Sequence, residues 1–113
     1  MAKRSIKKAL SGLDRSDEVF ASAAELFKVM SASMRLKILA CLCDGEQNVS
    51  YLLSKIDTTQ PNMSQHLRTL HRAKILGKRR DGIQIFYHVI DERVLDICRA
   101  VFAHVENADS KKS

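Results

Sequence analysis

Apolar residues after residue 15 recur at the three- and four-residue spacing of amphipathic helices. In the first such segment Ser16 can cap the helix, and Asp17 and Glu18 lie in the first turn, where acids are favoured. A second helix can be capped by Ser33 and ended by Gly45. The pattern therefore predicts two consecutive helices, with apolar faces made of Val19, Phe20, Ala23, Leu26, Phe27 and Met30 in the first and of Leu36, Ile38, Leu39, Leu42 and Cys43 in the second.

Two further helices are predicted on either side of a short turn. Asn48 can cap a helix over residues 49–56, and Thr58 or Thr59 can cap the next one. Pro61 is compatible with this start, because the first turn of a helix has no internal partner for the missing N–H. Two helices joined by a turn of three or four residues form the helix-turn-helix arrangement. The inward stripe of its second helix is Met63, Leu67 and Leu70.

The chain then changes to a strand pattern and ends in a helix. An Asp-Gly turn signal predicts a β-hairpin over residues 77–80 and 83–89, which would form a wing beside the fourth helix. Asp91 can cap a last helix with a broad apolar stripe. The predicted fold is mainly α with a small hairpin wing: four helices, two strands and a fifth helix. The strand alternation uses Ile83, Ile85, Tyr87 and Val89, and the last stripe uses Val94, Ile97, Cys98, Val101, Phe102 and Val105.

The charge distribution indicates what the fourth helix contacts. The chain has a formal net charge of +6, and residues 58–80 contain no Asp or Glu. Amide side chains can pair with adenine and guanidinium groups with guanine, while hydroxyls and lysines reach phosphates. We therefore expect the helix to enter a DNA major groove and the wing to touch the backbone. The expected DNA contacts are Thr59, Gln60, Asn62, Ser64, Gln65, His66, Arg68 and Arg72 on the helix, and Lys78, Arg79, Arg80 and Gln84 on the wing.

Composition limits the remaining classes of protein. A chain of 113 residues with 45% hydrophobic residues fits one domain, expected over 16–106 between a basic flexible arm (1–15) and a disordered tail (107–113). No run approaches the roughly 18 apolar residues that cross a bilayer, and no secretory signal is recognisable, so a cytoplasmic protein is expected. No nucleophile, base and orienting group recur at catalytic spacing, which predicts neither an enzyme nor a bound cofactor.

Three segments carry a family resemblance. VMSASMRLKILACL, TTQPNMSQHLRTLHRAKIL and RRDGIQIFYHV, in this order, resemble the ArsR/SmtB-type winged-helix repressors over residues 21–105. The resemblance implies a homodimer joined through the first and last helices. It also implies that the fourth helix reads a palindromic operator on double-stranded DNA and that an inducer releases the protein. The two apolar end helices independently suit dimerisation.

The metal sites known in this family fit the chain poorly. The Cys-x-Cys-Asp box of its metalloid sensors would fall at the start of the third helix, where the chain has Asn48, Ser50 and Tyr51 in place of thiols. The matching positions of its zinc sensors are Asp91, Arg93, His104 and Asn107. Only Asp91 and His104 could bind zinc, so they are weak candidates, and no metal is expected.

The cysteines leave two interpretations open. Three cysteines, an odd number within apolar stretches, are expected to be reduced. Members of the family that sense reactive sulfur or oxidants pair a cysteine of the second helix with one of the last, which here suggests Cys41 or Cys43 with Cys98. In the pattern of those sensors the two positions are Ala40 and Glu106, so a switch here would be built differently. The three cysteines can equally be packing residues.

A metal-responsive repressor and a non-sensing nucleoid protein that binds DNA by charge and shape remain the alternative functions.

Overall fold

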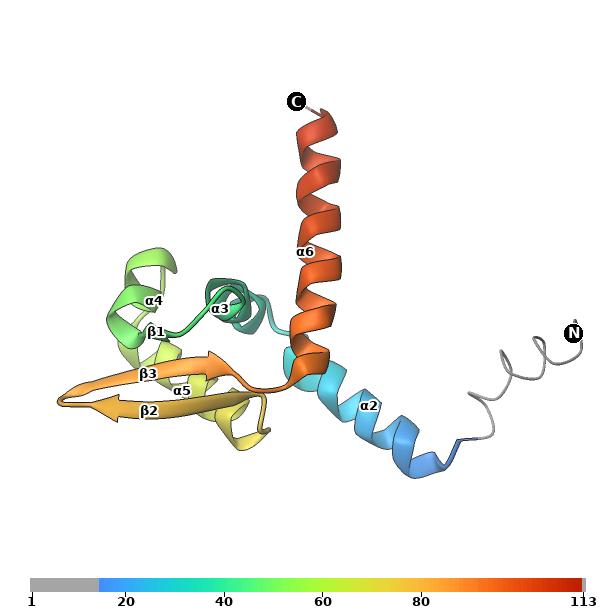
Figure 1. Cartoon of the computed structure of the whole chain (residues 1–113), viewed down its shortest axis with the longest axis horizontal. Helices are drawn as coiled ribbons and strands as arrows, with labels where there is room; N and C mark the ends of the chain where they lie inside the picture. The colour runs from blue at the N-terminus through green and yellow to red at the C-terminus, as the bar shows by residue number, and fades with distance from the viewer. Residues whose placement is uncertain (1–14, 113) are drawn as a thin grey trace, which may run out of the picture.

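The structure, a computed structural model, describes residues 15–112, with side chains described up to residue 103 (Figure 1). It is mainly helical with a hairpin wing, as predicted. The expected arm of residues 1–15 lies, except for Arg15, outside the described residues. The elements in order are α2 (Asp17–Met30), α3 (Ser33–Leu42), β1 (Gln47–Asn48), α4 (Val49–Lys55), α5 (Gln60–Arg72), β2 (Leu76–Asp81), β3 (Gln84–Val89) and α6 (Glu92–Lys112).

The sheet has a third strand that the sequence pattern did not predict. Strand β1 pairs antiparallel with β3, and the strand order is β1-β3-β2. The expected order, four helices followed directly by two strands, was wrong at this point, because two residues are too few to show an alternating pattern. Ile83 was also expected within a strand. It lies instead in the turn between β2 and β3, beside Gly82 with its φ of +65°, and its side chain is 100% exposed.

Local hydrogen bonds explain where the helices of the helix-turn-helix begin. The Asn48 side-chain oxygen accepts from the Tyr51 amide at 2.7 Å, so Asn48 caps α4 as predicted. Thr59 Oγ1 accepts from the Asn62 amide at 3.2 Å, which selects Thr59 as the cap of α5. Ser33, expected as a cap, is the first residue of α3, since Ala32 occupies the N-cap position.

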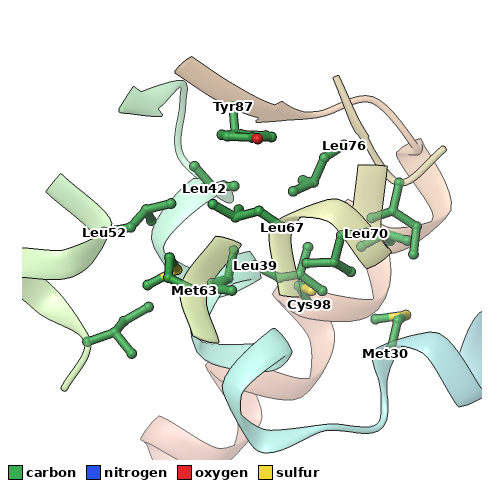
Figure 2. Close-up of a cluster of buried hydrophobic side chains, with 14 residues drawn as sticks. Met30, Leu39, Leu42, Leu52, Met63, Leu67, Leu70, Leu76, Tyr87 and Cys98 are labelled. Atoms are coloured by element: carbon green, nitrogen blue, oxygen red, sulfur yellow. The ribbon is translucent and has the colours of Figure 1, made fainter. Parts of the chain in front are cut away.

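The core lies between α3, α4, α5 and the sheet (Figure 2). Helix α5 contributes the predicted stripe of Met63, Leu67 and Leu70, which packs beneath Leu76 and Tyr87 of the wing strands. Each fully buried aliphatic side chain of this kind stabilises the fold by about 1.5–3 kcal/mol. The wing and α5 are therefore held in one packed unit. The other buried residues are Met30, Ile38, Leu39, Leu42, Leu52, Ile56, Ile75, Val94 and Cys98.

Helices α2 and α6 extend away from this unit (Figure 1). Met30 is the one buried residue of α2, and the apolar face predicted for that helix is otherwise open or half-buried in the single chain. Phe27 is 55% exposed and Val101 on α6 is 50% exposed. Helix α6 runs to Lys112, past the limit of 106 that polar composition had suggested for the folded domain. None of the described helices is both long and apolar enough to cross a membrane.

Candidate DNA-binding interface

The outer face of α5 carries polar and basic side chains. Gln65, Arg68 and Arg72 are exposed and fall within about 60° of each other around the helix, opposite the buried stripe. Among the described residues none of these three side chains has a hydrogen-bond partner or an ion pair. No acid lies on this helix. The face is therefore free to bind a negatively charged partner through amide and guanidinium groups.

Two predicted contacts on α5 are less available than the sequence suggested. Asn62 is half-buried, and its side-chain nitrogen donates to Thr58 Oγ1 at 2.8 Å. Its amide group thus closes the turn before the helix. His66 is also half-buried; burial and, secondarily, the Arg35 guanidinium lower its pKa. A half-buried, neutral imidazole is less available for an outward contact than the sequence suggested.

The predicted wing residues fall on two faces of the hairpin. Strand residues alternate in direction, so Lys78 and Arg80 share the face of their cross-strand partners Tyr87 and Ile85. Tyr87 packs on the core, so this is the face directed toward α5. Arg79 lies on the opposite face. All three basic side chains are exposed to solvent at least in part.

A groove of about 410 Å³ lies between the helix-turn-helix and the wing. It brings Gln60 and Ser64 of α5 together with Gln84 of β3, three residues that the sequence predicted as contacts. The exposed Ile83 at the wing tip also lines it, a residue that the sequence had assigned to a strand. Side-chain amides and hydroxyls beside an apolar tip can hold the edge of a DNA strand.

Glu46 and Asn48 contact two of the expected DNA-binding residues of the wing, and the sequence analysis did not identify either contact. Glu46 accepts hydrogen bonds from Arg79, and Asn48 donates to Gln84 at 2.8 Å. These pairs join residues more than 30 positions apart in the chain. Periodicity reports only local neighbours, so no signal in the single sequence links them.

Comparisons with known proteins place the chain in a family. A sequence profile described as "Bacterial regulatory protein, arsR family" matches residues 33–78. An uncharacterized HTH-type transcriptional regulator of Methanocaldococcus jannaschii is 35% identical over 85 residues, which are 74% of this chain and 96% of that protein. The chain belongs to the ArsR family. The biofilm growth-associated repressor of Agrobacterium fabrum is 35% identical over 80 residues, covering 71% of this chain and 68% of the repressor.

A solved structure has the same fold. The structure of HlyU from Vibrio cholerae superposes with a TM-score of 0.73 and 30% identity, covering 76% of this chain and 94% of HlyU. The predicted resemblance and the winged-helix fold are thereby confirmed. The similar proteins are named as transcriptional regulators and not as enzymes. This ArsR-family chain is a DNA-binding transcriptional regulator.

The candidate inducer residues separate into two groups. Cys43 and Cys98 line one cavity of about 540 Å³ between α3 and α6, together with Val101 and Phe102. Burial and, secondarily, Cys43 raise the pKa of Cys98 to about 11. Cys41 does not line that cavity, and burial, partly offset by the Lys55 charge, raises its pKa. All three thiols are free.

Of the two weak metal candidates, Asp91 and His104, the structure describes the side chain of Asp91 only. Both Asp91 carboxylate oxygens accept from the Arg93 guanidinium, at 3.0 and 2.6 Å, and this pairing lowers the Asp91 pKa. Asp91 also accepts from the Arg93 amide, as a capping residue does. The side chain of His104 lies outside those described. Among the side chains of residues 15–103, no three of His, Cys, Asp or Glu are grouped so as to hold a metal ion.

Proposed function

We propose that the chain is a repressor that reads a specific operator with the outer face of α5. The observation that carries this proposal is the set of exposed, unpaired Gln65, Arg68 and Arg72 on a helix without acids. Arg can bond guanine O6 and N7 together, and Gln can bond adenine N6 and N7. A surface that bound phosphates alone would need no glutamine. The same face therefore favours a specific regulator over an architectural DNA-binding protein.

The wing supplies the sequence-independent part of binding. Lys78 and Arg80 lie on the α5-facing side of the hairpin, where their charges would meet the DNA backbone beside the recognition helix. Gln60, Ser64 and Gln84 line the groove between the two elements and would hold the strand edge. Thr59, the N-cap residue of α5, adds an exposed hydroxyl at the start of the helix.

The functional unit in this proposal is a homodimer joined through α2 and α6. Val19, Phe20, Phe27 and Val101 are exposed large apolar residues on these two helices. An open groove of about 640 Å³ runs along the same face of α2 toward Ile97 of α6. A second copy related by two-fold symmetry would cover this surface and present two α5 helices to the two halves of a palindrome.

The inducer in this proposal acts on Cys43 and Cys98. Both thiols meet the same cavity between α3 and α6, so oxidation by peroxide could join them: each thiol loses one proton and one electron, and the peroxide is reduced to two waters. A bridge requires Cα atoms within about 7 Å. Because α6 also carries the proposed dimer surface, a change at Cys98 would alter the spacing of the two α5 helices. A metal-responsive repressor is less well supported, since Asp91 is bound to Arg93.

Selection of a binding sequence from random duplex DNA tests the proposal. The purified protein is expected to enrich a palindromic motif, and a mobility-shift assay is expected to show preference for that duplex over poly(dI-dC). Enrichment of no motif, with equal binding to both duplexes, would leave an architectural DNA-binding protein as the better description.

A further inference from the structure

Glu46, just before β1, binds Arg79 of β2 through both carboxylate oxygens. Arg79 Nε donates to Glu46 Oε1 and Oε2 at 2.9 and 3.0 Å, and Arg79 Nη2 donates to Oε1 at 2.7 Å. Bidentate pairing of a carboxylate with a guanidinium fixes the orientation of both planar groups. This pairing lowers the pKa of Glu46 and raises that of Arg79, so both groups are charged at neutral pH.

The Arg79 guanidinium is also fixed by its neighbours on the sheet. It lies over the ring of Phe86, its cross-strand partner on β3, at 4.5 Å from the ring centroid. A carboxylate oxygen of Asp81 lies 4.0 Å away. Guanidinium groups stack on aromatic faces as well as pairing with acids. Arg79 thus lies between two acids, Glu46 and Asp81, and His88 Nδ1 lies 3.9 Å from Glu46 Oε2. The Arg79 charge is already matched by carboxylates within the protein.

The pair connects the residue just before β1 with β2, the strand at the other edge of the sheet. The central strand β3 lies between β1 and β2 (Figure 1). The Glu46–Arg79 contact therefore spans β3. It is made on the sheet face opposite to Lys78 and Arg80, because strand residues alternate in direction. Arg79 is therefore turned away from the side on which α5 lies.

A second contact joins the same two parts of the chain. The side-chain oxygen of Asn48 caps α4 through the Tyr51 amide, while its nitrogen donates to Gln84 on the wing. One asparagine thus connects the first helix of the helix-turn-helix with the hairpin. The three residues 46–48, with backbone pairing to β3 and these two side-chain contacts, tie the wing to the helix-turn-helix.

We propose that Glu46 and Arg79 form a brace that sets the position of the wing, and that Arg79 is a positioning residue that makes no contact with DNA phosphate. This inference rests on the proposed DNA-binding function of α5 and the wing. It separates the three consecutive basic residues of β2 into two roles. Lys78 and Arg80 supply charge to DNA, whereas Arg79 holds the hairpin on which they lie.

The salt dependence of DNA binding distinguishes the two roles. A plot of the logarithm of the binding constant against the logarithm of salt concentration has a negative slope. Each phosphate neutralised by a protein cation adds about 0.9 to the magnitude of this slope. Arg79→Gln is expected to weaken binding to the selected operator several-fold while leaving this slope at the wild-type value. Lys78→Gln, the matched control on the same strand, is expected to reduce the magnitude of the slope by about 0.9 for each subunit that contacts the operator. If the magnitude of the slope decreased equally in both variants, Arg79 would contact a phosphate and the proposed brace would be refuted.

A double-mutant cycle tests the pair itself. Glu46→Gln removes a negative charge as well as the brace, so Asp44→Asn, an exposed acid two residues away, corrects for charge alone. After this correction, Glu46→Gln and Arg79→Gln are expected to weaken operator binding by similar factors, and the double variant by no more than either. Additive effects, or tighter binding by Glu46→Gln than by Asp44→Asn, would contradict the proposal.

Measurements on the free protein keep the brace separate from the DNA-binding function. Amide hydrogen exchange of Gln84, Ile85 and Phe86 is expected to accelerate in Arg79→Gln and in Glu46→Gln, but not in Lys78→Gln. Unchanged exchange in both brace variants would overturn the proposal. The two proposals can fail separately. If the wild type bound no duplex while exchange was still accelerated in the two brace variants, the proposed function would be refuted and the brace would stand.

Discussion

Cys43 at the C-cap of α3 and Cys98 on α6 line the same cavity, and Cys43 is one of the two causes of the raised pKa of Cys98. The neighbouring pair is thus Cys43 with Cys98, whereas the sequence had left Cys41 as an equal candidate. Cys98 is 2% exposed and protonated at neutral pH, so the more accessible Cys43 is the thiol that an oxidant meets first.

Peroxide or polysulfide is expected to release the protein from its operator through these two thiols. Free thiols, three in the reduced chain, should fall to one on peroxide treatment, and dithiothreitol should restore both the thiols and DNA binding. Cys43→Ser and Cys98→Ser should abolish release, while Cys41→Ser, the matched control on the same helix, should respond like the wild type. Full release of Cys98→Ser would refute the thiol switch. Release by zinc but not by oxidants would favour a metal site.

Stability should fall at alkaline pH because of Cys98. Its pKa in the folded protein is raised from the ordinary 9.0 to about 11, so between these values the unfolded chain ionises first and binds fewer protons. The free energy of unfolding therefore decreases as pH rises through this window. Urea titrations of wild type and Cys98→Ala at several pH values test this: the difference between them should shrink or change sign above pH 9.0. A difference independent of pH would refute the raised pKa.

Truncation on the outer face of α5 should reduce specificity. Gln65→Ala and Arg68→Ala are each expected to weaken operator binding by roughly 1–3 kcal/mol, the value of one bidentate base contact, with little change for poly(dI-dC). Lys78→Ala should weaken both duplexes alike. Competition titrations with the two duplexes separate these outcomes. If the three variants lost specific and nonspecific binding in equal proportion, α5 would not be the reading element.

A carboxylate in the proposed dimer surface should separate the subunits. Val101→Glu would place an unpaired charge in an apolar seam, which is costly, and should yield monomers with greatly reduced operator affinity. Ile83→Glu is the matched control, since this exposed residue lies in the turn between β2 and β3. Figure 1 shows that turn far from α2 and α6. Sedimentation at micromolar concentration should show a dimer for the wild type and Ile83→Glu. A monomeric wild type would exclude the dimer proposal.

The order of helices, the cap at Asn48 and the buried stripe of α5 could be predicted from sequence, which left the cap of α5 open between Thr58 and Thr59. These features depend on neighbours within one or two helical turns, so spacing and residue type report them directly. The outward position of Gln65 and Arg68 follows from the same periodicity. Ile83 was wrongly assigned to the second hairpin strand because the alternation of apolar and polar residues continues through the turn. The positive φ of Gly82 marks this turn in the structure, and the sequence pattern does not show it.

The sequence by itself determined a winged-helix protein whose fourth predicted helix is free of acids, because helical periodicity and charge are local properties. Only the tertiary structure decided which distant groups meet. It paired Glu46 with Arg79 across the sheet, gave Asn48 a contact on Gln84, and placed Cys43 rather than Cys41 at the cavity of Cys98. The physical reason is that strand register and helix packing, which the whole core sets together, determine which side chains come within hydrogen-bond distance.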